Sequence, residues 1–248
     1  MEPDSVKMLP TVYVILNTLD GAKTLSKMAN DTGRAKSTVC QWANMLADFG
    51  LIRKSVDGGV VYYEVTALGA VLREKLKDVV EFVEVLHQAG NYFSSHDISP
   101  IPIDLLEDLR YLKGCRIVQT TDPYELCGEL SEMLCNSSWI YGVFSVFHPK
   151  LLEMLSSLAK KKRVMLILSD RALEKARREL SGFEEVSVSV CEGLRLNLTV
   201  AEKGLSLSLY SAKGEYDSSL LMCTSEMSIE WGRRLFECYV RMSRKVKL

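Results

Sequence analysis

The chain has 248 residues and a formal net charge of −1, and 47% of its residues are hydrophobic. That length leaves room for more than one domain, and that composition supports buried cores. The near-neutral charge excludes a polycation that attracts nucleic acid over its whole surface. No segment approaches the roughly 18 uncharged apolar residues of a membrane span, and the N-terminus lacks the apolar core of a signal peptide. We therefore expect a soluble, cytoplasmic protein.

The first expected helix opens the N-terminal module. Pro10 stands where a proline can start a helix. Its apolar face then consists of Val12, Ile15, Leu16 and Leu19, which would pack beneath the elements that follow.

Residues 24–41 have the pattern of a helix-turn-helix. Thr24 can cap a short helix, Gly33 permits a tight turn, and a second helix is expected from Arg34 onward. In such a motif the second helix enters the major groove of duplex DNA. Val39, Ala43 and Leu46 would face the core, and the side chains left outside to contact DNA are Arg34, Lys36, Ser37, Thr38, Gln41 and Trp42.

These outward residue types suit contact with DNA. Arginine and lysine neutralise phosphates, serine and threonine hydrogen-bond to backbone or base edges, and Gln41 carries the paired donor and acceptor that match adenine. From Asp20 to Val56 there are six Lys or Arg against three Asp or Glu, a local net charge of +3. Attraction to DNA would therefore come from this patch alone.

A β-hairpin wing is expected after Gly50. Two strand-like runs, 51–55 and 60–65, are joined through a turn with Gly58 and Gly59, which tolerate positive φ. Lys54 and Gly58 complete the expected DNA contacts. The sequence thus predicts a winged helix-turn-helix domain over residues 1–66; the alternative is a small helical domain that binds protein or nothing.

Residues 67–101 are expected to form a connecting helix and linker. Leu72, Leu76, Val79, Val83 and Leu86 follow a heptad-like spacing. This seam could pair across a homodimer or pack on its own chain, and two heptads do not decide between these alternatives. Two prolines in the segment 92–102 mark the loop that precedes the larger domain.

The larger domain, residues 102–248, alternates strands with helices. Strands are expected at 115–121, 139–147 and 163–168, and helices at 123–135, 149–160 and 171–180. This alternation predicts crossover connections and a largely parallel central sheet. Short strands follow at 186–190, 195–201, 205–210 and 220–223, and Ser225 caps a last helix through Arg241. The expected fold class is α/β, with an α+β winged module in front.

The cysteines give no sign of a metal site or a disulfide. They are scattered and contain no CxxC pair, so we expect reduced thiols, mostly buried, and neither metal nor cofactor. The seven are Cys40, Cys115, Cys127, Cys135, Cys191, Cys223 and Cys238. A redox role for them stays open.

Three segments together resemble a known family. They are the winged module, the segment 96–102 (HDISPIP), and residues 216–221 (YDSSLL) followed by 231–236 (WGRRLF). These look like archaeal winged-helix regulators of methanogenesis and filament formation. The resemblance implies a homodimeric transcription factor whose C-terminal domain is a phospholipase D-like α/β sandwich used for sensing. Relatives commonly have a basic residue where this chain has Gln41, so a different operator preference is expected.

A phospholipase D-like domain also raises the hypothesis of an enzyme. Catalysis there needs H-x-K-x-x-x-x-D, because histidine attacks phosphorus while lysine stabilises the developing charge. His148-Pro149-Lys150 supplies the first half, but Leu155 occupies the position of the aspartate. No second H-x-K, P-loop, G-x-S-x-G or H-E-x-x-H is found. We therefore expect no catalytic residues.

Polar residues on the late strands suggest instead a cleft for a small polar or anionic effector. The candidates are Tyr141, His148, Arg195, Asn197, Tyr210 and Asp217. Each could equally be a satisfied surface or structural residue. The preferred reading is an effector-responsive regulator that binds duplex DNA; the alternatives are a protein-interaction adaptor and, last, a phosphodiesterase-type enzyme. The operator, the effector and the direction of regulation are not fixed by the sequence.

Overall fold

The computed structural model describes residues 3–119, 126–180 and 186–246, and divides into two compact units, 1–81 and 82–248. The division falls inside the helix α4 (Ala67–Ser95), so the segment expected to connect two domains is shared between the units. Within the described residues, no helix has the length and apolar character needed to cross a membrane.

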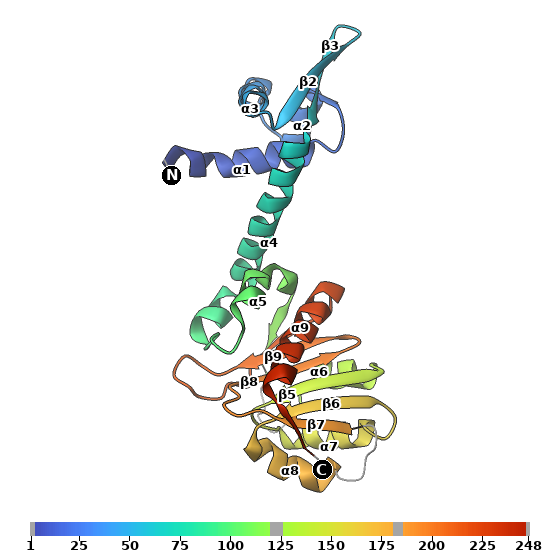
Figure 1. Ribbon diagram of the computed structural model, residues 1–248. Coiled ribbons are helices and arrows are strands. Elements are labelled where there is room, and N and C mark those ends of the chain that lie inside the picture. Colours follow the sequence, from blue (N-terminus) through green and yellow to red (C-terminus); the bar gives the residue numbers. More distant parts are fainter. Residues whose placement is uncertain (1–2, 120–125, 181–185, 247–248) are drawn as a thin grey trace. The chain divides into compact units, whose positions relative to one another are not determined.

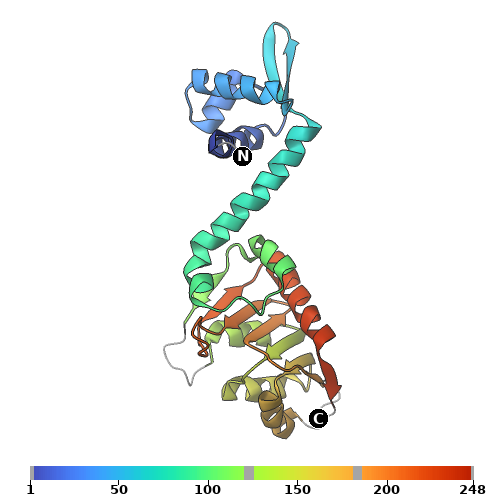
Figure 2. The same ribbon diagram turned by 60° about the vertical axis from the view of Figure 1, so that its left-hand side comes forward.

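The first unit is a helix-turn-helix followed by a hairpin, as predicted. Its helices are α1 (Pro3–Thr18), α2 (Leu25–Thr32) and α3 (Lys36–Asp48). Its strands are β1 (Lys23–Thr24), β2 (Ile52–Asp57) and β3 (Val60–Val65), which pair antiparallel in the order β1-β3-β2. The β2-β3 hairpin projects as a wing (Figure 2). Fully buried side chains at the centre of the unit are Ile15, Leu16, Met28, Val39, Ala43 and Leu46.

Two predicted helix starts in this unit are wrong. Pro10 lies inside α1 instead of opening it; the helix continues through it although proline cannot donate a backbone hydrogen bond. The second helix of the motif begins at Lys36 and not at Arg34, because Ala35 is extended, with φ −59° and ψ 139°. Arg34 therefore belongs to the turn that Gly33 opens with a φ of 64°.

The start of α4 is tied closely to the base of the wing. The Thr66 backbone N–H donates to the carbonyl of Leu51 at 3.0 Å, and the Thr66 hydroxyl donates to the carbonyl of Gly50 at 2.7 Å. The same hydroxyl accepts from the N–H of Gly69 at 3.1 Å. Gly69 has no room for a side chain, since a Cβ there would lie 2.0 Å from the Leu51 carbonyl oxygen.

The predicted apolar seam on α4 is divided in two. Leu76 is buried in the core of the first unit, and Leu72 packs against that core. Val79 and Val83 remain 58% and 56% exposed, and Leu86 is also exposed. One part of the seam thus packs on its own chain, and the other part is uncovered.

The second unit is built on one mixed sheet. Its strands are β4 (Arg116–Val118), β5 (Trp139–Phe144), β6 (Arg163–Leu168), β7 (Val186–Val190), β8 (Leu196–Ala201), β9 (Gly204–Leu209), β10 (Leu220–Cys223) and β11 (Arg244–Val246). Their order in the sheet is β11-β7-β6-β5-β8-β9-β10-β4.

The prediction of a largely parallel sheet is wrong. Only the pairs β5-β6 and β6-β7 are parallel, and the other pairs of neighbouring strands are antiparallel. The reason is that crossover helices link only these three strands: α7 (Pro149–Leu158) joins β5 to β6, and α8 (Asp170–Leu180) joins β6 to β7. The strand expected first in this alternation, β4, pairs instead with β10 at the far edge.

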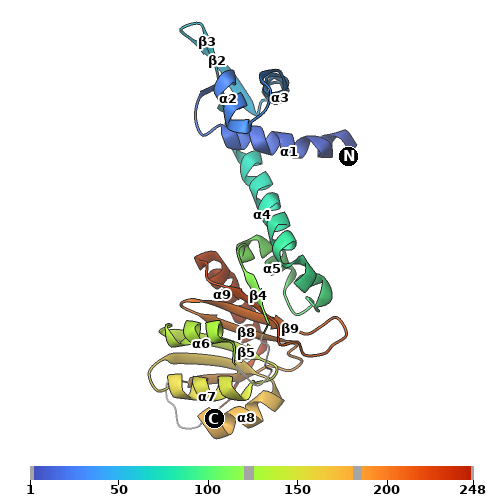
Figure 3. The same ribbon diagram turned by 180° about the vertical axis from the view of Figure 1, so that it is seen from behind.

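Helices cover both faces of the sheet. On one face lies α9 (Glu226–Met242), with α5 (Ile103–Glu107) and a 3₁₀ helix (Leu109–Leu112) beside it (Figure 1). On the other face lie α6 (Gly128–Cys135), α7 and α8 (Figure 3). Each layer buries its own apolar cluster against the sheet. The mixed α/β class is therefore confirmed, and the finer phospholipase D-like assignment stays a prediction.

Several sequence expectations need a further note. The helix α5, the 3₁₀ helix and the strands β1 and β11 were not predicted. The expected strand end at Thr121 and helix start at Pro123 lie outside the described residues. Ser225 caps the last helix as predicted, accepting from the N–H of Ser228.

The expectation that all cysteines are reduced is wrong for one pair. Cys115 and Cys223 form a disulfide between the ends of β4 and β10, with their Cα atoms 4.5 Å apart. The antiparallel register that pairs Arg116 with Met222 also places these two cysteines opposite each other. Spacing along the chain could not show this, because 108 positions separate them.

Candidate functional site

The first candidate site is the exposed face of α3 with the turn before it. Thr24 caps α2 by accepting from the Lys27 N–H at 3.3 Å, which fixes the helix that leads into the turn. Val39, Ala43 and Leu46 anchor α3 in the core. This anchoring leaves Lys36, Ser37 and Gln41 exposed on one side of α3, with Arg34 exposed in the turn and Thr38 half-buried.

The basic residues around α3 differ in whether a carboxylate neutralises them. Lys23 and Lys27 both pair with Asp31, at 2.9 and 3.0 Å. Arg53 pairs with Glu64 across the wing at 2.6 Å. In contrast, Arg34 and Lys36 form no ion pair within the part of the chain that the structure describes. Arg34 and Lys36 are therefore cations that no described carboxylate neutralises.

The paired lysines also explain a local electrostatic effect. Hydrogen bonds from Lys23 and Lys27, together with their charges, hold the pKa of Asp31 below its usual value although burial opposes this. Hydrogen bonds to Asp20, first, and to Asp31 raise the pKa of Lys23 above its usual value. Asp31 is thus held ionised as a link between β1 and α2.

The wing contributes one cation and its tip. Lys54 on β2 donates to the side-chain oxygen of Asn44 on α3 at 2.7 Å, so the ammonium group stays beside α3. Gly58 and Gly59 have φ values of 56° and 79° at the tip, as the predicted turn requires. Trp42 is a correction: it was expected to face outward, but it is half-buried and packs against the core of the unit.

The second candidate site is a cavity of about 270 Å³ in the larger unit. Its two sides differ in chemistry. The helix side is apolar, and the sheet side carries hydroxyl and amide groups from β8, β9 and the segment before β10. The described lining residues are Leu126, Cys127, Leu130, Phe144, His148, Leu151, Asn197, Thr199, Ser206, Ser208, Tyr216, Ser218 and Leu220.

Alternation along β8 and β9 produces this polar side. Leu196, Leu198, Leu205 and Leu207 are fully buried toward α9, while the intervening residues face the cavity. Thr199 and Ser206 are 2% and 3% exposed. Their hydroxyl groups form no hydrogen bond to any residue that the structure describes. Since buried polar groups normally have partners, these two hydroxyls are available to a ligand.

Of the six predicted effector residues, two line the cavity: His148 and Asn197. Asn197 also has a structural role, because its side-chain oxygen accepts from the N–H and the hydroxyl of Ser145, both at 2.9 Å. Tyr210 lies beside the cavity and donates to the Ser145 hydroxyl at 3.2 Å. These contacts position the end of β5, from which the chain continues to His148.

Arg195 and Asp217 belong to a separate polar cluster. Arg195 pairs with Asp97 at 3.3 Å, and Asp217 contacts Nε2 of His96 at 2.9 Å. Burial tends to raise the pKa of Asp217, but hydrogen bonds from Ser219 and the contact with His96 outweigh it and lower that pKa. His96 also stacks on Tyr92 with ring centroids 4.1 Å apart. This cluster fixes the loops around it.

Tyr141 does not join the cavity. It lies on the opposite face of the sheet, where its ring stacks on Phe236 of α9 at 5.0 Å. The reason is the alternation of side chains along β5. Tyr141 and Phe144 are an odd number of positions apart, so they point to opposite faces of the sheet. Sequence reasoning also missed Tyr216, whose hydroxyl contacts Asn197 at 3.4 Å and whose pKa is raised by desolvation.

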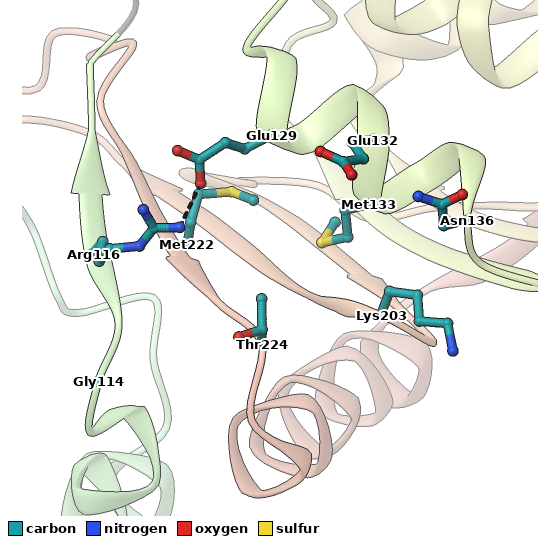
Figure 4. Close-up of a pocket in the computed structure, with 9 residues that line it drawn as sticks. All are labelled: Gly114, Arg116, Glu129, Glu132, Met133, Asn136, Lys203, Met222 and Thr224. Atoms are coloured by element: carbon teal, nitrogen blue, oxygen red, sulfur yellow. Dashed lines mark hydrogen bonds and ion pairs between the residues drawn. The ribbon is translucent and has the colours of Figure 1, made fainter.

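A wider groove of about 890 Å³ lies at the β4 edge (Figure 4). Arg116 on β4 reaches Glu129 on α6 at 2.8 Å, and Glu132 and Lys203 stand at the rim. Met133 and Met222 lie between α6 and the sheet. The lining of the groove contains two cations, Arg116 and Lys203, and two carboxylates, Glu129 and Glu132. Among the described residues, no cluster of His, Cys, Asp or Glu is arranged to hold a metal ion.

The fold defines a winged-helix unit combined with a three-layer α/β unit. Residues 123–242, in the α/β unit, match the family model described as the middle domain of the methanogenesis regulatory protein FilR1. The chain is also 27% identical to the methanogenesis regulatory protein FilR1 of Methanothrix harundinacea (strain 6Ac) over 263 aligned residues. That alignment covers 97% of this chain and 58% of the relative's length. Both matches are similarities to methanogenesis regulatory proteins.

Solved structures show weaker likenesses. The archaeal chromatin protein TrmBL2 matches with a TM-score of 0.45 and 14% identity, covering 96% of this chain and 93% of that one. The DNA-binding protein Sso10a-2 of Sulfolobus solfataricus matches with a TM-score of 0.33 and 17% identity, covering 35% and 90%. Human N-acetylserotonin methyltransferase matches with a TM-score of 0.24 and 11% identity, covering 73% and 59%.

Proposed function

We propose that this protein is a transcription regulator that binds duplex DNA through α3 and the wing. The observation that carries the proposal is the arrangement of charge: Arg34 and Lys36 are exposed and form no described ion pair, whereas neighbouring lysines are neutralised by Asp31. Cations left free on a helix that protrudes from a small core are suited to phosphates. The similarity to a methanogenesis regulatory protein supports the same proposal.

Roles within this interface follow from side-chain chemistry. Arg34 and Lys36 neutralise phosphates, and Ser37 and Thr38 bond to the DNA backbone or base edges. Gln41 contacts a base edge, and Lys54, held beside α3 by Asn44, contacts a phosphate next to it. Gly58 lets the wing tip approach the DNA backbone closely. Trp42, being half-buried, shapes the surface more than it contacts bases.

Binding to promoter duplexes at several salt concentrations tests this proposal. Lys36→Ala should weaken binding to every duplex by a similar factor and reduce the steepness of the salt dependence by about one phosphate contact. Lys160→Ala, an exposed lysine in the larger unit, makes the same charge change and should have no effect. Absence of duplex binding by the wild-type chain at low salt would leave the adaptor alternative in its place.

The cavity in the larger unit is the proposed effector site. A regulator responds to a ligand only if the ligand binds its two states with different affinity. A coupling of about 1–3 kcal/mol, or roughly five- to 150-fold in operator affinity, is typical of such responses. We assign the response to the cavity lined by His148 and Asn197, since the buried hydroxyls of Thr199 and Ser206 in it have no hydrogen-bond partner among the described residues.

We further infer that the protein is a homodimer that pairs through α4. A single winged helix makes few contacts, and two half-sites give useful specificity. Val79, Val83 and Leu86 form an exposed apolar stripe on this 29-residue helix. Leu76, in contrast, is buried in its own unit, so a substitution there would test folding and not pairing.

Light scattering tests the dimer. Val79→Glu with Val83→Glu should convert a dimer to a monomer, because two carboxylates would be buried at the seam. Lys77→Glu, on the other side of α4, is the matched control and should leave the dimer intact. A wild-type monomer at tens of micromolar would contradict the inference.

We expect no phosphodiesterase function. Leu155, which occupies the position of the catalytic aspartate, has 0% exposure and lies in the apolar core beneath α7. A carboxylate at that position could not reach a substrate. His148 is therefore assigned to ligand binding and not to nucleophilic attack.

A further inference from the structure

A second cavity adjoins the one described above. The second cavity also has a volume of about 270 Å³ and lies at the ends of β5 and β6, beside α8. The two share His148 and Tyr216 as lining residues. Its other lining residues are Val146, Phe147, Pro149, Arg171, Ala172 and Lys175. We call the first the inner cavity and the second the outer cavity.

The outer cavity carries uncompensated positive charge. Arg171 and Lys175 are four positions apart on α8, so they lie on the same side of the helix. Neither forms an ion pair with any residue that the structure describes. No aspartate or glutamate is among the described lining residues of either cavity. An anion in the outer cavity would therefore meet two cations and no opposing carboxylate.

Two other basic groups near the sheet already have carboxylate partners. Arg195 is paired with Asp97, and Arg116 is paired with Glu129 in the groove of Figure 4. Glu132 adds a second carboxylate to that groove. Charge in both places is balanced by the protein itself, so neither favours an anion as the outer cavity does.

The inner cavity adds a requirement for the body of the ligand. Phe144, Leu130 and Leu151 provide apolar contact on one side, and Thr199 and Ser206 provide hydroxyl groups on the other. A cavity of about 150 Å³ accepts a benzene ring, so the 270 Å³ of the inner cavity accommodates a body of one ring with polar substituents.

Building on the function proposed above, we propose that the effector is a small amphipathic anion. Its phosphate or carboxylate lies between Arg171 and Lys175 in the outer cavity, and its single-ring body extends past His148 into the inner cavity. Arginine matches both anions with two parallel hydrogen bonds, and lysine adds a point charge. Hydroxyl or keto groups on the ring would pair with Thr199 and Ser206.

Three probes separate the parts of this proposal in calorimetric titrations of the full chain. Phenyl phosphate carries both the anion and the ring, benzyl alcohol carries the ring without the charge, and inorganic phosphate carries the charge alone. We expect phenyl phosphate to bind at least about tenfold more tightly than either of the other two, because only it fills both cavities.

Variants then locate the anion. Arg171→Ala should weaken phenyl phosphate about tenfold, as expected for the loss of a charged hydrogen bond, and leave benzyl alcohol unchanged. Arg177→Ala, an exposed arginine further along α8, is the matched control and should change neither. Equal effects of the two arginine substitutions, or no binding of phenyl phosphate at millimolar concentration, would overturn the proposal.

A further variant locates the ring. Ser206→Val should reduce the affinity for phenyl phosphate and benzyl alcohol while preserving that for inorganic phosphate, since valine narrows only the inner cavity. The thermal unfolding midpoint of Ser206→Val shows whether that variant is folded. If it is not folded, the Arg171→Ala variant, which changes only a surface side chain, decides the proposal. None of these titrations contains DNA. A protein that binds phenyl phosphate through Arg171 but binds no duplex therefore refutes the regulator function and leaves the ligand class standing.

Discussion

Two polar surfaces of this protein, the exposed face of α3 and the inner faces of β8 and β9, stand in opposite relation to their cores. Lys36, Ser37 and Gln41 project into solvent from a helix whose other side is apolar. Thr199 and Ser206 lie on a sheet with leucines on its far face, yet they are themselves buried. Polar groups on an exposed face are free to meet a large partner, whereas buried ones can serve only a ligand small enough to enter.

The largest expected effect is on stability, and it comes from removing the disulfide, which only the larger unit contains among the described residues. Replacing Cys115 and Cys223 by serine should lower the free energy of unfolding of the larger unit by on the order of 4 kcal/mol, because the crosslink closes a long loop in the unfolded chain. The affinity of the winged unit for DNA should not change. Denaturant unfolding with and without reductant measures this. Cys135→Ser, at an exposed free thiol, should behave as wild type; equal sensitivity of wild type and double variant to reductant would contradict it.

The two faces of β8 provide the next test. Leu198→Ala should destabilise the larger unit by about 2–5 kcal/mol, since it leaves a cavity beneath α9. Thr199→Val should change stability by less than about 0.5 kcal/mol, because the hydroxyl it removes has no described partner and the shape is kept. Equilibrium unfolding of both variants decides the matter. A loss of several kcal/mol for Thr199→Val would mean that this face is structural and not a ligand site.

On the exposed face, Gln41 should determine base choice. Gln41→Ala should cost about 1–3 kcal/mol on the preferred duplex and little on others, because a paired amide contacts a base edge. Competition binding with preferred and scrambled duplexes measures the difference. Lys36→Ala is the contrasting variant, for it should weaken both duplexes alike. A uniform loss for Gln41→Ala would remove it from base contact.

The smallest expected effect lies away from both surfaces. Glu202 accepts from the hydroxyl and the N–H of Ser138, which lowers its pKa to about 2. A carboxylate with a lowered pKa stabilises the folded state above the unfolded pKa, and this stability is lost as pH falls toward the folded value. The unfolding midpoint should therefore decline between about pH 4.5 and 2, and less so in Glu202→Gln. An unchanged acid limb in the variant would show that other carboxylates dominate.

The sequence predicted the winged unit well because its information is local. Thr24, Gly33 and the turn at Gly58-Gly59 specify caps and positive φ at single positions, and the core of α3 follows from the spacing of Val39, Ala43 and Leu46. Most strands and helices of the larger unit also lie where expected. What local signals could not give was the start of α3, since Ala35 takes an extended conformation that many residues adopt equally well.

The cavity was harder to predict for a different reason. Alternating serine and leucine along β9 is typical of a strand with one face in solvent. The structure buries both faces, because α6 and α7 cover the serine side. Pairing of β4 with β10, and hence of Cys115 with Cys223, depends on how strands far apart in sequence are ordered. Of the predicted effector residues, His148 and Asn197 reach the cavity because they follow β5 or lie on β8 with the correct alternation.

The contacts of Thr66 have a mechanical consequence. The Thr66 hydroxyl joins Gly50, which follows α3, to Gly69 in the first turn of α4. The absence of a side chain at Gly69 allows the backbone of α4 to approach that of Leu51 closely. The β2-β3 hairpin separates the two helices in sequence, but these direct contacts join them, so a movement of the first turn of α4 is passed to α3. A rotation of the first turn of α4 would therefore move the exposed face of α3 with it.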